Sequence, residues 1–477
     1  MGKLKTYSKW VVMALGVVAT FLFFQLYYPY HLLHREQVSL FLYSQEFILD
    51  RLMQPGGVSI LGGEFLTQFF YFIGGGATVV TLLLLGLGIL CYQALRRFMG
   101  HWMALILSVA VCLWEGGRLC IVNYPLASTL SLMGLFIIIR LISFKGSNRL
   151  GKNLTALVCI LLFIPFQPLR GVKAWGTPNF YLEHLLAMDV NASYGKWEKV
   201  SQLAQEDAKT GIGTFYYNLS NAMKGQLPDG LMNYYQPFSK GLFLPVDPSG
   251  NYLSFMASNE LWFHLGDMTM AEHSAILGMI STQDHRSVRM IKRMAEINLI
   301  NGDEEAAMKY LRMLQKTWKH KQWADQRIPG QQTPAVQKWL EHKRQYIPKA
   351  DTLRASADAR LSLRHLLESN PDNLLAYHYL LCYELLNKDI HSFVKDYIPQ
   401  KGIPSRLYHE AILIHLIRQN GNLTEEDFQT YRFTPEVLQD FQEYTRMYEQ
   451  NQGNGAALQS RFGKTYWFYY HYATMKK

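Results

Sequence analysis

The chain has 477 residues, 49% of them apolar, and a formal net charge of +10, a length that suits two or three domains. Residues 1–152 carry 12 Lys/Arg against 5 Asp/Glu, whereas the rest carries 35 against 32. Because the basic excess lies beside apolar segments, the composition argues against nucleic acid as a partner. The five cysteines show no CxxC or Cys/His spacing, so we expect neither a disulfide framework nor a metal site.

The first 170 residues contain apolar segments that are long enough, or nearly so, to cross a membrane. A bilayer core of ~30 Å needs about 20 helical residues. The first segment is expected to be an uncleaved anchor, because it exceeds the apolar core of a signal peptide and lacks small residues at its end. We therefore predict about five spans, at residues 10–30, 67–95, 102–122, 126–142 and 154–167, of which the last is the shortest.

The basic residues between these segments predict the orientation of the chain. Nine of them fall on one face of the membrane, namely Lys3, Lys5, Lys9, Arg96, Arg97, Arg140, Lys145, Arg149 and Lys152. Only Arg35, Arg51 and Arg118 fall on the other face. Since cytoplasmic loops are rich in Lys and Arg, the N-terminus is predicted to lie inside. Five crossings would then place the rest of the chain outside the cytoplasm, whereas four would leave it inside.

The first outward loop, residues 33–70, concentrates charge between two spans. It holds Arg35, Glu36, Glu46, Asp50, Arg51 and Glu64. Residues 37–54 are predicted to form one amphipathic helix lying in the membrane interface, although Leu40, Gln45 and Phe47 do not fit its two faces. Pro55-Gly56-Gly57 is expected to end this helix, because proline cannot continue it and glycine takes the left-handed turn that follows.

The second outward loop contains Glu115 and Arg118, which are three residues apart and can therefore pair on one helix face. Ionisable groups at membrane depth are costly and often functional. A pair that only pins a helix hairpin is the simpler interpretation. If the helices bundle, this pair is expected to approach Arg35 and Glu36 and form one polar patch.

From about residue 179 the pattern becomes repeated helix pairs with glycine or asparagine turns. The five predicted pairs are 216–234, 259–279, 293–314, 374–397 and 409–431. The turns near Gly225, Gly266 and Gly302 are 41 and 36 residues apart, close to the period of two-helix solenoids. The pairs resemble degenerate tetratricopeptide repeats, best at residues 301–307, and this resemblance implies a curved surface that binds peptides or proteins.

Two further segments depart from the repeats. Residues 319–351 form a basic, proline-containing insertion, predicted to be a solvated linker or else a contact with anionic lipid or a partner. The C-terminal sequence FGKTYWFYYHYA, residues 462–473, contains seven aromatic side chains. We expect it to cap the last repeat by burying its rings, and the alternative is an aromatic belt at the membrane interface.

The sequence therefore predicts an all-α protein with two parts. Residues 1–170 would form a transmembrane helix bundle, and residues 171–477 an extracytoplasmic α-solenoid of tetratricopeptide-like pairs. The triple glycine at residues 74–76 is not followed by Lys-Ser/Thr, which excludes a P-loop, and no cofactor is expected.

Three stretches carry a resemblance over nearly the full chain. They are LHREQVSLFLYSQEF with the following PGG and GEFLTQFF, then YNLSNAMKGQLPD, and the FGKTYWFYYHY tail. Together they resemble a family of bacterial multi-pass membrane proteins with helical-repeat C-terminal domains. The resemblance implies a bacterial inner-membrane location and brings no activity.

Two functions from different classes fit this layout. The first is a membrane-anchored scaffold that presents a protein- or peptide-binding surface, with membrane lipid as its other partner. The second is an enzyme, because the layout resembles polytopic glycosyltransferases that use lipid-linked sugar donors. In that reading Glu36 is the candidate base, Arg35 or Arg118 binds phosphate, and Glu64 or Asp50 supports them. The chain departs from those enzymes in having about half as many spans, and a transporter or assembly subunit is a third reading.

Overall fold

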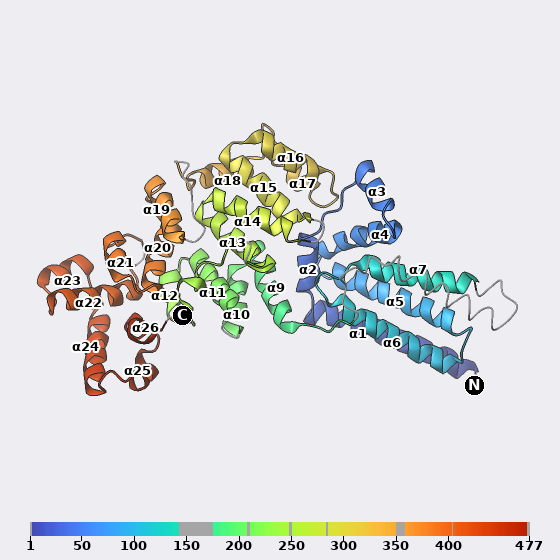
Figure 1. The fold of residues 1–477 in the computed structure, drawn as a ribbon, viewed down its shortest axis with the longest axis horizontal. Helices are drawn as coiled ribbons and strands as arrows, with labels where there is room; N and C mark the ends of the chain where they lie inside the picture. The colour runs from blue at the N-terminus through green and yellow to red at the C-terminus, as the bar shows by residue number, and fades with distance from the viewer. Residues whose placement is uncertain are drawn as a thin grey trace. The chain divides into compact units, whose positions relative to one another are not determined.

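A computed structural model describes residues 2–142, 175–207, 210–247, 250–282, 285–349, 358–402 and 404–474. Within these ranges the chain is helical and contains no strand (Figure 1), so the all-α prediction is confirmed for the described residues. The chain divides into two compact units. Unit 1 comprises Met1–Val190, Met279–Leu299 and Asp303–Val336, and unit 2 comprises Asn191–Gly278, Ile300–Gly302 and Gln337–Lys477.

Unit 1 combines the apolar N-terminal helices with a few later ones. Its helices are α1 (Gly2–Leu22), continued by a π-turn at Phe23–Tyr27, α2 (Tyr30–Gln37), α3 (Gln45–Leu52), α4 (Gly57–Thr67), a 3₁₀ turn at Gln68–Tyr71, α5 (Gly75–Leu95), α6 (His101–Leu119), α7 (Leu126–Ile142), most of α9 (Phe180–Ser193), most of α15 (Val288–Asn301), α16 (Glu304–Gln315) and α17 (Lys321–Asp325).

Three helical segments in the described residues are long and apolar enough to cross a membrane: Trp10–Tyr27, Gly75–Leu95 and His101–Leu119. The chain is therefore compatible with a membrane protein. The fourth predicted span coincides with α7, which is apolar but only 17 residues long, and the fifth, at residues 154–167, lies outside the described residues. The second span begins at Gly75 rather than at residue 67, because α4 ends there and Gly74 adopts a left-handed conformation with φ 79° before α5.

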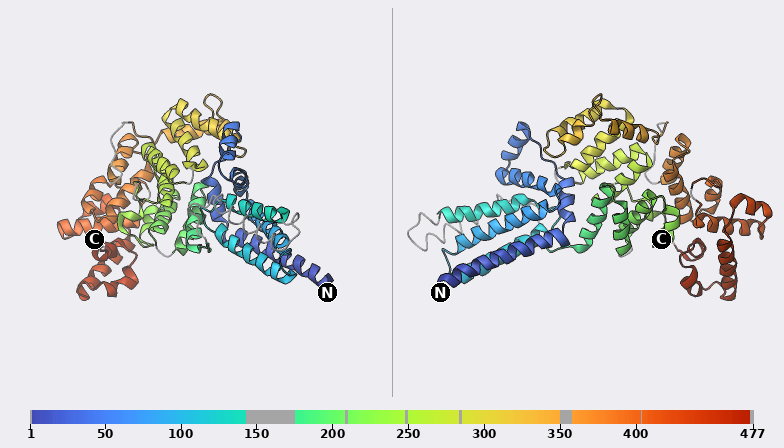
Figure 2. Two further views of the ribbon diagram at one scale, coloured as in Figure 1. Left: turned by 45° about the vertical axis from the view of Figure 1, so that its right-hand side comes forward. Right: turned by 180° about the vertical axis from the view of Figure 1, so that it is seen from behind.

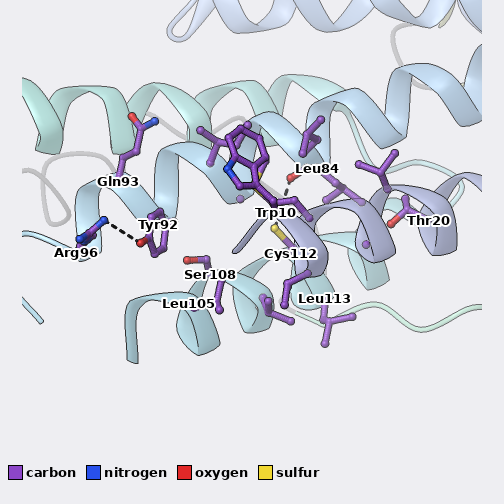
Figure 3. Close-up of a pocket in the computed structure, with 18 of the residues that line it drawn as sticks. Trp10, Thr20, Leu84, Tyr92, Gln93, Arg96, Leu105, Ser108, Cys112 and Leu113 are labelled. Carbon is purple, nitrogen blue, oxygen red and sulfur yellow. Dashed lines mark hydrogen bonds between the residues drawn. The ribbon is translucent and has the colours of Figure 1, made fainter. Parts of the chain in front are cut away.

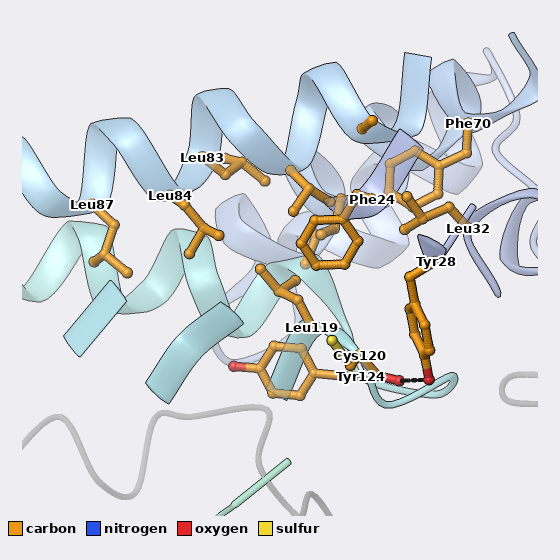
Figure 4. Packing of buried hydrophobic residues seen from close by; sticks show 13 residues of the cluster. Phe24, Tyr28, Leu32, Phe70, Leu83, Leu84, Leu87, Leu119, Cys120 and Tyr124 are labelled. Carbon is orange, nitrogen blue, oxygen red and sulfur yellow. Dashed lines mark hydrogen bonds between the residues drawn. The ribbon is translucent and has the colours of Figure 1, made fainter. Parts of the chain in front are cut away.

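Helices α1, α5, α6 and α7 run side by side as a bundle, with α2 at the end opposite the N-terminus (Figures 1 and 2). Their common core includes Phe24, Phe70, Leu87 and Tyr124, all at most 3% exposed (Figure 4). The hydroxyl of Tyr28 donates a hydrogen bond to the carbonyl oxygen of Cys120, 3.1 Å away. This bond joins the end of α1 to the end of α6.

The two ends of the bundle differ in chemistry. At one end Arg97 donates from Nη1 to the carbonyl oxygen of Arg140, 2.7 Å away, so α5 and α7 terminate together. We call this the basic end. At the other end the backbone N–H of Asn179 donates to the hydroxyl of Tyr28 over 2.9 Å. Because α2 follows Tyr28 directly, we call this the α2 end.

The predicted single helix over residues 37–54 is wrong. Helix α2 ends at Gln37, a non-helical segment follows, and α3 begins after Ser44, whose hydroxyl accepts a hydrogen bond from the backbone N–H of Phe47. The break is stabilised by a backbone hydrogen bond from Tyr43 to the carbonyl of Lys316, 2.7 Å long. The predicted end of the helix before Pro55-Gly56-Gly57 is confirmed, since α3 ends at Leu52.

The segment between α2 and α3 packs into later helices of unit 1. Leu40 is 7% exposed and belongs to a cluster with Ile291, Ala295, Leu311 and Leu314 of α15 and α16. The third predicted helix pair therefore packs together with the N-terminal loop. By contrast, the outer side of α3 is apolar and exposed at Met53 and neighbouring positions.

Unit 2 consists of short helices joined by tight turns. They are α10 (Trp197–Glu206), α11 (Gly211–Met223), α12 (Leu227–Leu231), a 3₁₀ turn at Phe238–Gly241, α13 (Tyr252–Leu265), most of α14 (Met268–Ile280), most of α18 (Pro334–Arg344), α19 (Ala359–Ser369), α20 (Leu374–Leu386), α21 (Ile390–Asp396), α22 (Arg406–Asn420), α23 (Glu425–Tyr431), α24 (Pro435–Gln450), α25 (Gly455–Phe462) and α26 (Tyr466–Tyr472).

Each of the five predicted helix pairs contains two helices, and the glycine turns lie where the spacing places them. Gly225, Gly266 and Gly302 all have positive φ, a conformation that glycine adopts without steric cost. At Gly266 a side chain would also collide with the backbone oxygen of Tyr346, 2.6 Å from the ideal Cβ position. The positive φ at these three turns therefore explains why glycine occupies them.

The insertion and the tail are both folded where described. Residues 319–349 contain α17 and α18, with Ala324 and Leu340 buried, so a solvated linker is not what this segment forms. In the tail, Tyr466 and Trp467 are fully buried. Trp467 donates from Nε1 to the carbonyl oxygen of Glu410, 2.9 Å away. The tail thus buries part of its aromatic cluster against α22 of the same unit, as the capping prediction expects.

Candidate functional site

The short helix α2 is the most polar buried element of unit 1. Its residues His31, His34, Arg35, Glu36 and Gln37 are all at most 9% exposed. Burying such groups costs several kcal/mol each unless they are paired or hydrogen-bonded. The partners come from later parts of the same unit, and we call the whole set the α2 junction.

Glu183 of α9 holds the N-terminus of α2. Its carboxylate accepts hydrogen bonds from the backbone N–H groups of Tyr30, at 2.5 Å, and His31, at 3.0 Å. These are N–H groups that a helix start leaves without an internal acceptor, and a carboxylate there also matches the positive end of the helix dipole. The imidazole Nδ1 of His31 lies 3.5 Å from the same carboxylate.

Asp189, one and a half turns further along α9, binds the middle of the junction. Its Oδ2 lies 2.8 Å from Nη1 of Arg289 and 3.5 Å from Nδ1 of His34. Burial alone would raise the pKa of Asp189, but Arg289 and His34 outweigh it and hold the pKa well below its usual range. Arg289 also donates to the side-chain oxygen of Gln37, 3.3 Å away.

Glu36 is buried and paired. Its Oε1 lies 2.9 Å from Nε2 of His320, and the side chains of both residues are at most 11% exposed. His320 is oriented by a backbone hydrogen bond to the hydroxyl of Thr317 and by edge contact with the ring of Tyr71. Burial lowers the pKa of the nearby Lys292, while Glu296 and Glu36 act in the opposite direction.

Arg35 points to a different set of neighbours. Its guanidinium lies over the ring of Phe70, 5.9 Å from the centroid. Burial lowers its pKa to about 10, and an electrostatic interaction with Tyr124 partly offsets this. Among the described residues, Nη1 of Arg35 has no hydrogen-bond partner.

Glu115 and Arg118 form the predicted pair, with Oε2 and Nη1 3.1 Å apart. Glu115 is completely buried and also accepts hydrogen bonds from the hydroxyls of Tyr124 and Thr129, each 2.6 Å long. The guanidinium of Arg118 lies over the ring of Tyr124, 4.6 Å from its centroid. Tyr124 therefore contacts both members of this pair and also acts electrostatically on Arg35, whereas Glu36 pairs with His320. One polar patch that includes all four charged residues stays a prediction.

Glu64 and Asp50 lie on the hairpin of α3 and α4. Glu64 pairs with Arg51 at 3.0 Å, whereas the side chain of Asp50 is 59% exposed and lies 3.9 Å from the same arginine. Arg51 is thus the cation that both carboxylates share. The structure does not place them in the α2 junction.

Sequence reasoning missed most members of the junction, in particular His31, His34, Glu183, Asp189 and Arg289. One local signal exists: His31 and His34 are three residues apart and share a helix face. The spacing of Glu183 and Asp189 on α9 gives no comparable signal. The charged pairs of the junction join residues that are 100 to 284 positions apart along the chain, from Asp189–Arg289 to Glu36–His320, so no local pattern connects them.

The chemistry of the junction follows from its pairing. Glu36, Asp189 and Glu183 each already bind a cationic or N–H donor group, and in the described residues no group of three or more His, Cys, Asp or Glu side chains is arranged to hold a metal ion. The arrangement is suited to joining helices. Breaking a buried ion pair of this kind typically costs about 3–5 kcal/mol.

Comparison with protein-family models matches residues 3–171 and 152–473 to a family described as "Family of unknown function (DUF6057)". Neither the curated proteins nor the solved structures gave a match.

Proposed function

Because this chain belongs to the DUF6057 family, whose description assigns no function, we propose a function from the geometry of the α2 junction. The protein is a membrane-anchored binding protein that presents a helical-repeat surface to a protein or peptide partner. It acts at the outer face of a bacterial inner membrane, and the junction holds α9 and α15–α17 to the membrane anchor.

The pairing of Glu36 with His320 is the observation that carries this proposal. Glu36 is the carboxylate with the best position for catalysis in the sequence, directly after the first span. It is buried at 6% exposure and 2.9 Å from its partner. A catalytic base needs access to the proton that it removes, whereas a structural link needs a buried, satisfied pair.

The arrangement of the bundle supports the outer location. Arg96, Arg97 and Arg140 lie at the basic end, where α1 also begins, whereas Asn179 lies beside Tyr28 at the α2 end. The end with the arginines is expected to face the cytoplasm. On this reading α9 lies on the opposite side of the membrane from the arginines.

The helix pairs of the C-terminal part support a binding role. Pairs with short glycine turns stack in tetratricopeptide-like arrays, and such arrays bind extended peptides on their curved surface. The best local match, at residues 301–307, forms the turn between α15 and α16, where Asp303 caps α16.

The alternative is an enzyme that uses a lipid-linked sugar donor. One observation favours it: the buried Nη1 of Arg35 has no hydrogen-bond partner among the described residues, and a phosphate would supply one. In that case Glu36 would be needed for its charge rather than for its hydrogen bond to His320.

Two substitutions of Glu36 separate these readings. Glu36→Gln keeps a hydrogen-bond acceptor for His320 and removes the charge, whereas Glu36→Ala removes both. For a binding protein, a deletion strain should be rescued by Glu36→Gln and less well by Glu36→Ala, whose thermal unfolding temperature and abundance should fall. If Glu36→Gln has the wild-type unfolding temperature but does not rescue the strain, the enzyme reading replaces the proposal.

Binding itself is tested with photo-crosslinking residues at exposed apolar positions of unit 2. Tyr235 and Ile398 are each 52% exposed, so substitution there leaves the core intact. We expect irradiated cells to give a discrete protein or peptide adduct from at least one position, and the same adduct mass in the Glu36→Gln background. Crosslinks to lipid alone at both positions would contradict a protein or peptide partner.

A further inference from the structure

A cavity of about 690 Å³ lies between α1, α5 and α6 of unit 1 (Figure 3). Val17, Leu84, Ile89 and Leu113 contribute to an apolar wall along its length. On α1 the lining runs from Trp10 to Thr20, about 15 Å at 1.5 Å per helical residue. That length is about half of the ~30 Å hydrocarbon core of a bilayer, the depth of one leaflet.

One end of this cavity carries three cations. Arg96, Arg97 and Arg140 all line it, and none of the described lining residues is acidic. Arg96 donates from Nη1 to the hydroxyl of Tyr92 over 3.2 Å, and Arg97 donates to the carbonyl oxygen of Arg140. Both of these contacts are with uncharged oxygen atoms. Guanidinium groups bind phosphate oxygens through paired N–H donors.

A buried acceptor lies at the same end. Gln93 lines the cavity on α5, about one turn before Arg96 (Figure 3), and its Oε1 is buried with no hydrogen-bond partner among the described residues. An unpaired buried acceptor costs about 1–3 kcal/mol. A hydroxyl donor on a bound headgroup would remove that cost, so the chemistry favours a headgroup that has hydroxyl groups as well as phosphate.

The space is open rather than tightly packed. An ideal Cβ added to Gly16, which lines the cavity on α1, meets no atom of the described residues within 4 Å. Protein interiors are close-packed, and an apolar space of this size within a membrane-spanning bundle is suited to a hydrocarbon chain. Basic pockets between membrane helices on the cytoplasmic side are known to hold anionic lipid headgroups.

We propose that this cavity binds an anionic phospholipid with a hydroxylated headgroup, of the phosphatidylglycerol type. One acyl chain lies between α1, α5 and α6, the phosphate binds Arg96, Arg97 and Arg140, and a headgroup hydroxyl donates to Gln93. The lipid belongs to the leaflet at the basic end. This site is separate from the α2 junction and does not depend on the binding function proposed above.

The test uses the full chain in detergent micelles that contain equal amounts of phosphatidylglycerol and phosphatidylethanolamine, followed by native mass spectrometry of the retained lipid. We expect at least tenfold more phosphatidylglycerol than phosphatidylethanolamine on the wild-type protein. The variant with Arg96→Gln, Arg97→Gln and Arg140→Gln should lose this preference. Equal retention of the two lipids by the wild-type protein would overturn the proposal.

A pair of glycine variants tests the position of the acyl chain. Gly16→Leu fills part of the cavity. Gly134→Leu is the control on α7: an added Cβ there also meets no atom of the described residues within 4 Å, and Gly134 does not line the cavity. We expect Gly16→Leu to lower lipid retention at least fivefold and Gly134→Leu to leave it unchanged. Equal effects of the two would overturn the site. If Gly16→Leu is not monodisperse in gel filtration, the arginine variant decides alone.

Discussion

Nη1 of Arg289 lies 2.8 Å from Oδ2 of Asp189 inside unit 1, although the two residues are 100 positions apart. Both are at most 9% exposed. The bond joins α9, which follows the membrane helices, to α15, which belongs to the third predicted helix pair. Together with the Glu36–His320 pair, this ion pair attaches α15–α17 to the earlier helices of unit 1 through buried charged groups.

Removing one partner of this pair should destabilise the protein more than removing both. Asp189→Ala removes the carboxylate beside the buried Arg289 cation, and breaking a buried ion pair in this way typically costs about 3–5 kcal/mol. Because the pair depresses the pKa of Asp189, its contribution is present at neutral pH and is lost only when the pH falls below the usual carboxyl range.

The double-mutant cycle of Asp189→Ala and Arg289→Met, followed by thermal unfolding of the full chain in detergent, measures this coupling. We expect the double variant to unfold at a higher temperature than Asp189→Ala alone. Additive losses from the two single variants would show that the contact does not link the helices.

The sequence predicts the local parts of this architecture well. Helix α7 has the bounds that its apolar run predicts, and the turns at Gly225, Gly266 and Gly302 lie where the repeat spacing places them. These features depend only on residues that are close in sequence, through the hydrophobic period and the conformational freedom of glycine. The confirmed pairing of Glu115 with Arg118 is local in the same sense.

The α2 junction is not predictable in this way, because its bonds join residues that are far apart in sequence. One local signal of this departure exists in the sequence: Leu40 and Phe47 are the apolar residues that do not fit the apolar face of the predicted helix 37–54. Both are buried, at 7% and 6% exposure. Leu40 marks the place where tertiary packing with α15 and α16 overrides the helical period, whereas Phe47 packs against the ring of Phe41 and the guanidinium of Arg286.

In unit 2, Glu384 should make stability depend on pH. It is completely buried, and burial, reinforced by Asp396, raises its pKa to about 8 despite the opposing effect of Arg360 and Arg364. A raised carboxyl pKa means that the folded state holds a proton that the unfolded state has released, so stability falls as pH rises from about 4.5 to about 8. The free energy of unfolding falls by about 1.4 kcal/mol for each unit by which the pKa in the folded state exceeds that in the unfolded state.

We expect Glu384→Gln, which cannot ionise, to flatten this dependence, so that its unfolding temperature exceeds that of the wild-type chain at pH 8 and approaches it at pH 5. The measurement is thermal unfolding between pH 5 and pH 8.5. Glu368→Gln on α19 is the matched control, because that side chain is 71% exposed. If both variants follow the wild-type curve, Glu384 does not titrate in this range.

The tail should contribute strongly to the stability of unit 2. Trp467 is fully buried and donates from its indole N–H to Glu410. Trp467→Ala is expected to cost about 3–5 kcal/mol, the usual range for removing a large aromatic side chain from a core. Phe428→Ala, at a position that is 42% exposed, should cost less than about 1 kcal/mol. Limited proteolysis of the full chain distinguishes the two, since only the first should expose the tail to cleavage.

The orientation of the bundle leads to the last prediction. Gly100 lies in the turn between α5 and α6 at the basic end, and an added Cβ there meets nothing within 4 Å. Asp50 lies on α3, beyond the α2 end, with its side chain 59% exposed. In a chain whose five cysteines are replaced by alanine, a single thiol at either position should therefore be reachable by solvent.

With a membrane-impermeant maleimide we expect Asp50→Cys to react in cells whose inner membrane is intact, and Gly100→Cys to react only after that membrane is lysed. The reason is that we propose a cytoplasmic location for the arginines at the basic end, which would leave the α2 end and the α2 junction outside. The opposite labelling pattern would place the junction in the cytoplasm. The binding surface would then meet a cytoplasmic partner, while the proposed phospholipid would lie in the outer leaflet of the same membrane.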